Sequence, residues 1–260
     1  MARFAKWQIV SRLRSQVEFE WISGAKLIVK RGMTGATGNI YCGLHEFVEM
    51  AFLLHLLKPG ELFIDVGANI GSYAVLASKV CGARSIAFEP DPETVKWLRR
   101  NIEVNHLQAL AVVHDVALGA RNGEIAFTVG LDTTNHVAAA QDQRVRMVAV
   151  RRLDDIADAA HPTLVKLDVE GFEEQVLLGA SHVLSSPSLL AVQSELCSPF
   201  VQTTLASFGF KPFFYDPMAR RLSQEQCGYG MSNALFIRDH ASVMDRVRQA
   251  PLRSVLGNEI

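Results

Sequence analysis

The stretch ELFIDVGANIGSYAVLASKV, Glu61–Val80, carries the pattern that decides the fold. An apolar run ends at an aspartate, two glycines follow four residues apart, and apolar residues at helical spacing then begin. A strand that turns through glycine into a helix is typical of an open parallel sheet, in which ligands bind beyond the carboxyl ends of the strands. The stretch therefore predicts an α/β domain with a nucleotide-type site at this turn.

The same order of strand, turn and helix repeats further along the chain. The expected strands are RSIAFEP, LAVVHDVALG, TLVKLDVEG and SLLAVQSEL, followed by the closing strands FKPFFYD and NALFIRD. Two runs rich in β-formers, GEIAFTVG and VRMVAV, interrupt this rhythm and predict an inserted β-hairpin. Short apolar strands that alternate with helices indicate a mostly parallel sheet with helices on both faces.

The chain is expected to divide into three parts. Residues 1–58 form an N-terminal extension, residues 59–240 the α/β domain, and residues 241–260 a C-terminal tail. Within the extension AKLIVKRG predicts a strand, TGATGNIYCG a glycine-rich connection, and LHEFVEMAFLLHLLKPG a helix that could cover the site. The basic start MARFAKWQIVSRLRSQ is interpreted as a surface helix, although peripheral contact with a membrane is an alternative.

Composition narrows the class of protein. The chain has 260 residues, of which 49% are hydrophobic and 20% charged, and its formal net charge is −1. This charge gives no attraction to a polyanion, so no nucleic-acid partner is expected. There is no apolar run of about 18 residues, so no transmembrane segment is expected. The four cysteines are scattered without a C-x-x-C pair, which favours a reducing, cytoplasmic location. The oligomeric state is left open.

Acidic residues end the expected strands. They are Asp65, Glu89, Asp115, Asp168 and Glu195. Their spacing matches one strand–helix unit, except where the hairpin is inserted. Several carboxylates in one crevice repel one another unless hydrogen-bond donors or a cation offset their charge. The pattern therefore favours a positively charged ligand with many hydrogen-bond donors. The alternative is that individual acids only cap helices.

The turn itself reads D-x-G-x-N-x-G and not G-x-G-x-x-G. Asp65 would repel a pyrophosphate but suits an ammonium group, while Gly67 and Gly71 allow close approach of the backbone. Glu89, which lies 22 residues after Gly67, suits the hydroxyls of a ribose. An adenosine that carries an amino-acid tail satisfies both conditions, and the sequence therefore predicts S-adenosylmethionine as the cofactor.

Several motifs carry a family resemblance in the same order. FIDVGANIGSYAVLA, AFEPDPET, LRRNIEVN and LVKLDVEGFEEQVLLGA resemble the FkbM family of S-adenosylmethionine-dependent methyltransferases. The resemblance implies a Rossmann-like class I methyltransferase fold: a mostly parallel seven-stranded sheet, helices on both faces, and a closing antiparallel strand pair. It also implies O-methylation of a hydroxyl on a sugar, a glycan or glycolipid, or a natural product.

The resemblance assigns roles to residues of the turn and the strand ends. Asp65, Gly67 and Gly71 would surround the methionine part, Glu89 would accept both ribose hydroxyls, and Asp115 would receive the adenine amino group. Asn69 and the Val116 backbone would lie beside them, although Asn69 could equally only cap the helix.

A hydroxyl acceptor must lose a proton, so a general base is expected. The candidates are Asp168, Glu170 and Glu195 at strand ends and His136 in the inserted loop, with Asp168 narrowly ahead of His136. The three acids could also converge on magnesium, but no spacing demands a metal and none is expected. Glu46, on the covering helix, is a further candidate contact.

Three other functions were weighed. An NAD(P)-linked oxidoreductase of the short-chain type would need Tyr-x-x-x-Lys, and no tyrosine is followed by a lysine at that spacing. An RNA base methyltransferase often carries Asn/Asp-Pro-Pro-aromatic after the fourth strand, where this chain reads DVEG. A non-catalytic binding module of the same fold remains open, because a fold does not fix a function.

Overall fold

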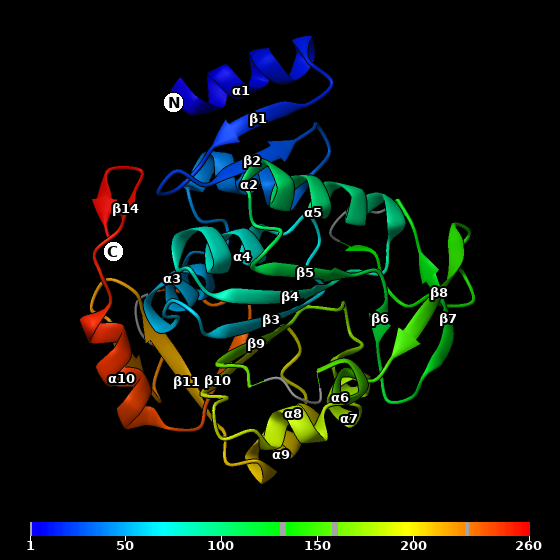
Figure 1. Cartoon of the computed structure of the whole chain (residues 1–260), viewed down its shortest axis with the longest axis vertical. Helices are drawn as coiled ribbons and strands as arrows, with labels where there is room; N and C mark the ends of the chain where they lie inside the picture. Colours follow the sequence, from blue (N-terminus) through cyan, green and yellow to red (C-terminus); the bar gives the residue numbers. More distant parts are fainter. Residues whose placement is uncertain (1, 131–133, 158–160, 227–228) are drawn as a thin grey trace.

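The protein is described by a computed structural model that covers residues 2–130, 134–157, 161–226 and 229–260. An eight-stranded sheet runs through the centre of this part of the chain (Figure 1). In spatial order the strands are β12 (Arg221–Ser223), β11 (Lys211–Asp216), β13 (Ala234–Ile237), β10 (Ala191–Ser194), β9 (Leu164–Leu167), β3 (Leu62–Val66), β4 (Arg84–Phe88) and β5 (Ala111–His114).

The pairing is that of a class I methyltransferase sheet. Strands β10, β9, β3, β4 and β5 are parallel, and β13 runs antiparallel between β10 and β11. The fold class and the closing antiparallel pair are therefore confirmed, but the expected count of seven strands was one too few. The extra strand, β12, is three residues long and follows a tight turn in which the Asp216 carboxylate accepts the N–H groups of Met218 and Ala219. Such a short edge strand carries no readable alternation.

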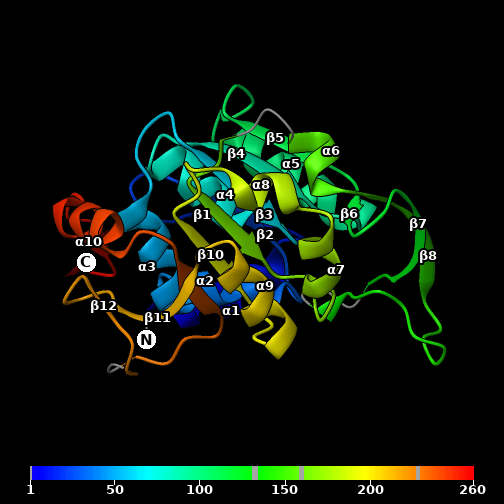
Figure 2. The ribbon, with the colours of Figure 1, turned by 90° about the horizontal axis from the view of Figure 1, so that it is seen from below.

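Helices cover both faces of the sheet, and each face has its own apolar cluster (Figures 1 and 2). Phe63 packs in one cluster and Ile64 in the other, because successive side chains of a strand point to opposite faces. One face carries α3 (Phe47–Leu56), α4 (Ser72–Val75), the π-helical turn η1 (Leu76–Val80), α5 (Pro92–Val104) and α10 (His240–Gln249). The other carries α6 (Leu153–Ala157), α7 (Glu173–Leu178), α8 (Ser181–Ser185) and α9 (Pro199–Ser207).

The N-terminal segment is fastened to α5 by two asparagines. It contains α1 (Ala2–Leu13), β1 (Val17–Glu20), β2 (Lys26–Val29) and α2 (Thr34–Cys42). The buried amides of Asn101 and Asn105 accept the N–H groups of Ile28 at 2.6 Å and Lys26 at 2.8 Å. A small hairpin, β14 (Ser254–Val255) and β15 (Asn258–Glu259), closes the C-terminal end.

The expected glycine-rich connection at residues 34–43 is wrong, because α2 is a helix. Gly38 within this helix serves close packing instead of a turn. A Cβ placed on Gly38 would lie 2.2 Å from Nδ1 of His45, so a larger residue would collide with the next segment. Glycine lowers helix propensity, and here tertiary packing outweighs that preference.

The inserted hairpin is confirmed as β7 (Gly123–Thr128) and β8 (Val145–Arg151), and it projects from the body in both views (Figures 1 and 2). The short strand β6 (Ala117–Leu118) pairs in parallel with β8 and makes a three-stranded sheet. Among the residues that the structure describes, no helix combines the length and the apolar character needed to cross a membrane.

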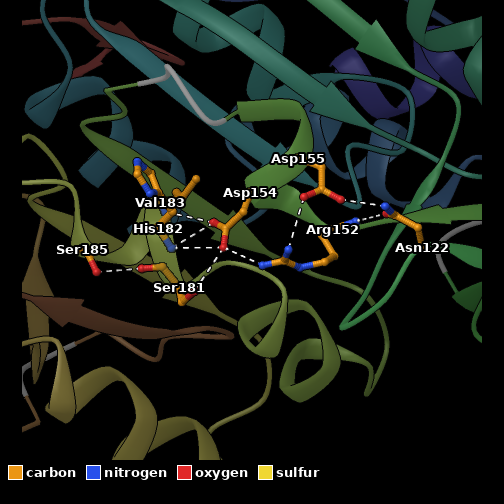
Figure 3. Close-up of polar contacts among 8 residues, drawn as sticks. All are labelled: Asn122, Arg152, Asp154, Asp155, Ser181, His182, Val183 and Ser185. Atoms are coloured by element: carbon orange, nitrogen blue, oxygen red, sulfur yellow. Dashed lines mark hydrogen bonds and ion pairs between the residues drawn. The ribbon is translucent and has the colours of Figure 1, made fainter.

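A polar network fixes the base of this insertion to the body (Figure 3). The buried Asp154 carboxylate accepts the N–H groups of His182 and Val183 at 3.0 and 3.1 Å, at the start of α8. Arg152 pairs with Asp154 at 3.2 Å and with Asp155 at 3.3 Å. The chain leaving β8 is thereby held against α8.

Replacing Asp154 with alanine should lower the free energy of unfolding by about 2 kcal/mol, because it leaves buried N–H donors at the start of α8 without an acceptor. Asp155→Ala, an exposed neighbour on the same helix, is the matched control and should cost less than about 1 kcal/mol. Urea denaturation measures both, and equal losses in the two variants would contradict the assignment.

Candidate active site

A cavity of about 280 Å³ opens at the carboxyl ends of the parallel strands. The N-terminal segment and α3 cover one side of it through Asn39 and Glu46, and the inserted sheet contributes Phe127, Asn135 and Val137. Eight of the residues expected at the site line the cavity: Glu46, Gly67, Asn69, Glu89, Val116, Asp168, Glu170 and Glu195. Four are not among its lining residues: Asp65, Gly71, Asp115 and His136.

The turn after β3 depends on Gly67. Its φ is +82°, and a Cβ there would lie 1.8 Å from the backbone oxygen of Asp168. Only glycine combines this backbone conformation with so close an approach to the neighbouring strand end. Gly71 serves packing behind the cavity, because a Cβ there would lie 2.4 Å from Cδ1 of Leu98.

Glu89 presents an oriented carboxylate to the cavity. Its Oε2 accepts the N–H of Asn69 at 3.0 Å, and its Oε1 accepts the N–H of Asp91 at 2.9 Å. Burial raises its pKa to about 7, and these two donors oppose that shift. Each carboxylate oxygen can accept a second hydrogen bond, so Glu89 fits a ligand diol on the cavity side. This geometry fits the ribose of S-adenosylmethionine.

Asp65 lies behind the turn and is buried, with 1% of its surface exposed. Its Oδ2 has no hydrogen-bond partner among the described residues, and burial raises its pKa to about 7. The positive charge of Lys166 opposes this shift. Direct contact between Asp65 and the methionine part of the cofactor therefore stays a prediction that this placement does not favour.

Asp115 and Val116 point in different directions. Val116 lines the cavity, whereas Asp115 is exposed and its Oδ2 lies 3.7 Å from Nη2 of Arg99 on α5. The expected contact of Asp115 with adenine stays a prediction, and the structure favours Val116 at that place. The sequence could not distinguish them, because both follow the end of β5 directly.

A buried lysine forms the centre of the charged part of the site. Lys166 is 2% exposed, and its Nζ pairs with Asp168 and lies 4.0 Å from Oε2 of Glu46 and 4.5 Å from the centre of the Tyr73 ring. Burial alone would lower the pKa of Lys166, but the charges of Asp168, Glu46 and Asp65 outweigh it and raise that pKa. The Tyr73 hydroxyl donates to Glu46 and completes the cluster.

Sequence reasoning missed Lys166, although a signal was present. A lysine inside the apolar run TLVKLD is unusual, and Asp168 two residues later lies on the same face of the strand. A buried lysine requires a carboxylate partner, so the pair could have been predicted from this spacing.

The two carboxylates that end β9 and β10 differ in proton affinity. Burial tends to raise the pKa of Asp168, but the adjacent Lys166 outweighs burial and holds it below the ordinary value. Burial and the negative charge of Asp168 raise the pKa of Glu195 to about 7. The Glu195 carboxyl is hydrogen-bonded to Asp168. Between these two groups, Glu195 is the better proton acceptor near neutral pH.

Glu170 and His136 are less well placed to act as a base. Glu170 lines the cavity, and its backbone has a φ of +52°. Burial and the negative charge of Asp168 raise the pKa of Glu170. His136 is bound within its own loop, with Nδ1 at 2.9 Å from the Thr134 oxygen and Nε2 at 3.2 Å from Oδ2 of Asp142. The Thr134 carbonyl is the main cause that raises the pKa of His136. Residues 131–133 of this loop lie outside the described part.

No group of three or more histidine, cysteine or acidic side chains is arranged to hold a metal ion in the described ranges of the chain. The charged groups nearest Lys166 are Asp168 and Glu46, and Glu46 also accepts from the Tyr73 hydroxyl.

Replacing Asp65 with asparagine should remove part of the pH dependence of stability. The folded-state pKa of about 7 lies above the ordinary value of 3.8, so Asp65 binds its proton more tightly in the folded chain. Its contribution is complete below pH 3.8 and is lost as the pH rises through about 7. Between pH 6 and pH 8 the free energy of unfolding, measured with urea, should fall by about 1 kcal/mol more in the unaltered chain than in Asp65→Asn. Glu89 and Glu195 change stability with pH equally in both chains, so the difference between the chains reports Asp65 alone. If stability varied with pH in the same way in both chains, the raised pKa of Asp65 would be contradicted.

Comparison with known proteins identifies a family for this chain. Residues 65–231 match the methyltransferase FkbM domain. Hexuronic acid methyltransferase AglP of Haloferax volcanii is 28% identical over 144 residues, which cover 54% of this chain and 59% of AglP. A ribosomal protein L11 methyltransferase of Chloroflexus aurantiacus is 31% identical over 96 residues, which cover 36% of this chain and 28% of that protein. The chain thus spans less than two thirds of the length of either relative.

A solved structure is similar at a lower level. The methyltransferase FkbM of Methylobacillus flagellatus KT has a TM-score of 0.46 and 17% identity, over 91% of this chain and 59% of that one. This likeness is too distant to support an argument about the site. The domain match, in contrast, extends over more than half of the 260 residues. The resemblance found in the sequence is confirmed, and the chain belongs to the FkbM family of methyltransferases, whose methyl donor is S-adenosylmethionine.

Proposed function

We propose that this chain methylates a hydroxyl group of a sugar, a glycan or a hydroxylated natural product. One observation carries the proposal. A single cavity joins the oriented carboxylate of Glu89 and the Gly67 turn with the carboxylates of Asp168 and Glu195. The first pair suits a nucleoside, and the second suits an acceptor that must give up a proton.

The cofactor half of the cavity is built from the turn and its neighbours. Glu89 would accept the ribose hydroxyls, and the Gly67 backbone would approach the cofactor without a side chain between them. Phe88, Val116 and Leu118 line the adjoining region and offer apolar surface for a purine ring. Glu46 and Asp168 would supply negative charge near the positively charged end of the cofactor.

The transfer half needs little chemical assistance from the protein. When bound, the cofactor supplies a methyl group already activated by its sulfonium. The residues of this chain must orient the acceptor oxygen, exclude water and accept one proton. Asn135 and Val137 of the inserted loop line the same cavity and would select the acceptor. Loops beside a rigid site commonly determine specificity.

The charge of the cavity favours a neutral acceptor. Its lining carries Glu46, Asp168, Glu170 and Glu195, while the positive charge of Lys166 is already paired. AglP is named for a hexuronic acid, which supports a sugar acceptor. A uronate carboxylate would nevertheless meet like charge here, so we propose an uncharged sugar or glycan in this case. A cytoplasmic location stays a prediction from the scattered cysteines.

Glu89→Ala should weaken S-adenosylmethionine binding by about 1.5–3 kcal/mol, the usual range for a hydrogen bond to a charged group. Calorimetry measures the dissociation constant. Glu93→Ala, which removes an exposed carboxylate from the first turn of α5, is the control and should leave binding unchanged. Equal affinity of Glu89→Ala and the unaltered chain would exclude the ribose assignment.

A neutral methyl hexopyranoside should be a better acceptor than the matching uronate by about tenfold in kcat/KM, because like charge at a few ångströms costs about 1–4 kcal/mol. Transfer of a labelled methyl group from S-adenosylmethionine measures both rates, and mass spectrometry of the product locates the methyl on an ether oxygen. A preference for the uronate, with the methyl found as an ester, would contradict the proposal.

A further inference from the structure

Two carboxylates end neighbouring parallel strands at the floor of the cavity. Ser194 of β10 pairs with Leu167 of β9, and the next residues along the two strands are Glu195 and Asp168. The N–H of Glu195 donates to the Leu167 oxygen at 3.0 Å, which continues the ladder past the last paired residues. Backbone pairing therefore fixes the separation of these two side chains, and both line the cavity.

Asp168 forms an ion pair within the protein and is therefore not available to take a proton from the acceptor. Its carboxylate pairs with the buried Lys166, and Lys166 is fixed in turn by Glu46 and by the face of the Tyr73 ring. A carboxylate that neutralises a buried ammonium is held in place and is a weak base. Asp168 therefore has the geometry of a fixed negative charge beside a reacting group.

Glu195 has the complementary geometry. Its residue is exposed and lines the cavity, and its carboxyl can donate to Asp168 only while it carries a proton. The charges that act on it are those of Asp168, Glu170 and Glu173, all negative, and together with burial they raise its pKa to about 7. A carboxylate with this proton affinity can accept a proton near neutral pH and return it to solvent.

The rival groups lack one of these properties. His136 lies outside the cavity lining, with both ring nitrogens bound in its own loop. Glu170 lines the cavity, but it lies in the turn after Asp168, with φ of +52°, and outside the paired ends of β9 and β10. Glu195 lines the cavity at a strand end whose backbone position is fixed by the pairing of β9 with β10.

We propose that Glu195 is the catalytic base of the transfer and that Asp168, held by Lys166, is the residue that positions it. The inference rests on the proposed function. The acceptor oxygen forms a bond to the methyl carbon as the carbon–sulfur bond breaks, and that bond's electron pair stays on sulfur, which becomes a neutral thioether. The hydroxyl proton passes to the Glu195 carboxylate, which releases it to water.

The direct test is Glu195→Gln, which keeps the size of the side chain and removes its proton affinity. Turnover should fall by about 100-fold or more, the usual scale for a general base, while S-adenosylmethionine affinity stays unchanged. In the unaltered chain turnover should rise with pH through about 7, as Glu195 loses its proton, and this rise should disappear in Glu195→Gln. Glu103→Gln, an exposed carboxylate on α5, is the matched control and should keep both rate and profile.

Asp168→Asn separates positioning from a merely structural role. The charge and hydrogen bond of Asp168 raise the proton affinity of Glu195, so the rise in turnover should move to lower pH in this variant. Loss of turnover with an unmoved profile would mean that Asp168 only supports the fold, and it would overturn the positioning role.

Failure of the inference can be told apart from failure of the proposed function. If the unaltered chain binds S-adenosylmethionine but methylates no hydroxyl acceptor, the proposed function fails and the base role fails with it. If the unaltered chain methylates a hydroxyl and Glu195→Gln does so within tenfold of its rate, the base role alone is overturned. Abolished turnover in Glu170→Gln, with near-normal turnover in Glu195→Gln, would assign the base to Glu170 instead.

Discussion

The pairing of Lys166 with surrounding carboxylates is the constraint on which the site depends. An ammonium buried in the middle of a strand is costly unless opposite charges neutralise it. The partners come from three separate segments: Asp168 follows β9, Glu46 precedes α3, and Asp65 lies within β3 opposite Lys166. The charge of Lys166 therefore links the start of α3 to the end of β9, beside strands that backbone pairing already joins.

The net charge of the site and its surroundings depends on pH. One ammonium faces several acids, and the pKa values of Asp65, Glu89 and Glu195 are each raised to about 7. The number of negative charges at the site therefore changes over a narrow range around neutrality. A positively charged ligand favours the ionised forms of these acids, so its binding and the release of protons are coupled.

Much of the fold was predictable because it follows from periodicity and from glycine at a single turn. Of the five acids expected at strand ends, Glu89, Asp168 and Glu195 line the cavity, whereas Asp65 and Asp115 do not. Periodicity gives the face of a strand but not the depth of a side chain. For this reason it could not show that Asp65 lies behind the turn or that Asp115 faces solvent.

The remaining differences have the same kind of cause. The helix α2 was missed because Gly38 serves close packing, which local propensity does not register. The three-residue strand β12 is too short to show a pattern. The role of Lys166 depends on Glu46, which lies more than a hundred residues earlier in the chain, and pairing over such a separation has no local signature.

The asparagine clamp between β2 and α5 has a consequence for the order of folding. The acceptors for Ile28 and Lys26 lie 73 and 79 residues later in the chain, so they leave the ribosome well after the strand that they hold. Asn101 also donates to the backbone oxygen of Ile70 in the glycine turn. During synthesis the hydrogen bonds that hold β2 therefore cannot form until α5 has been synthesised.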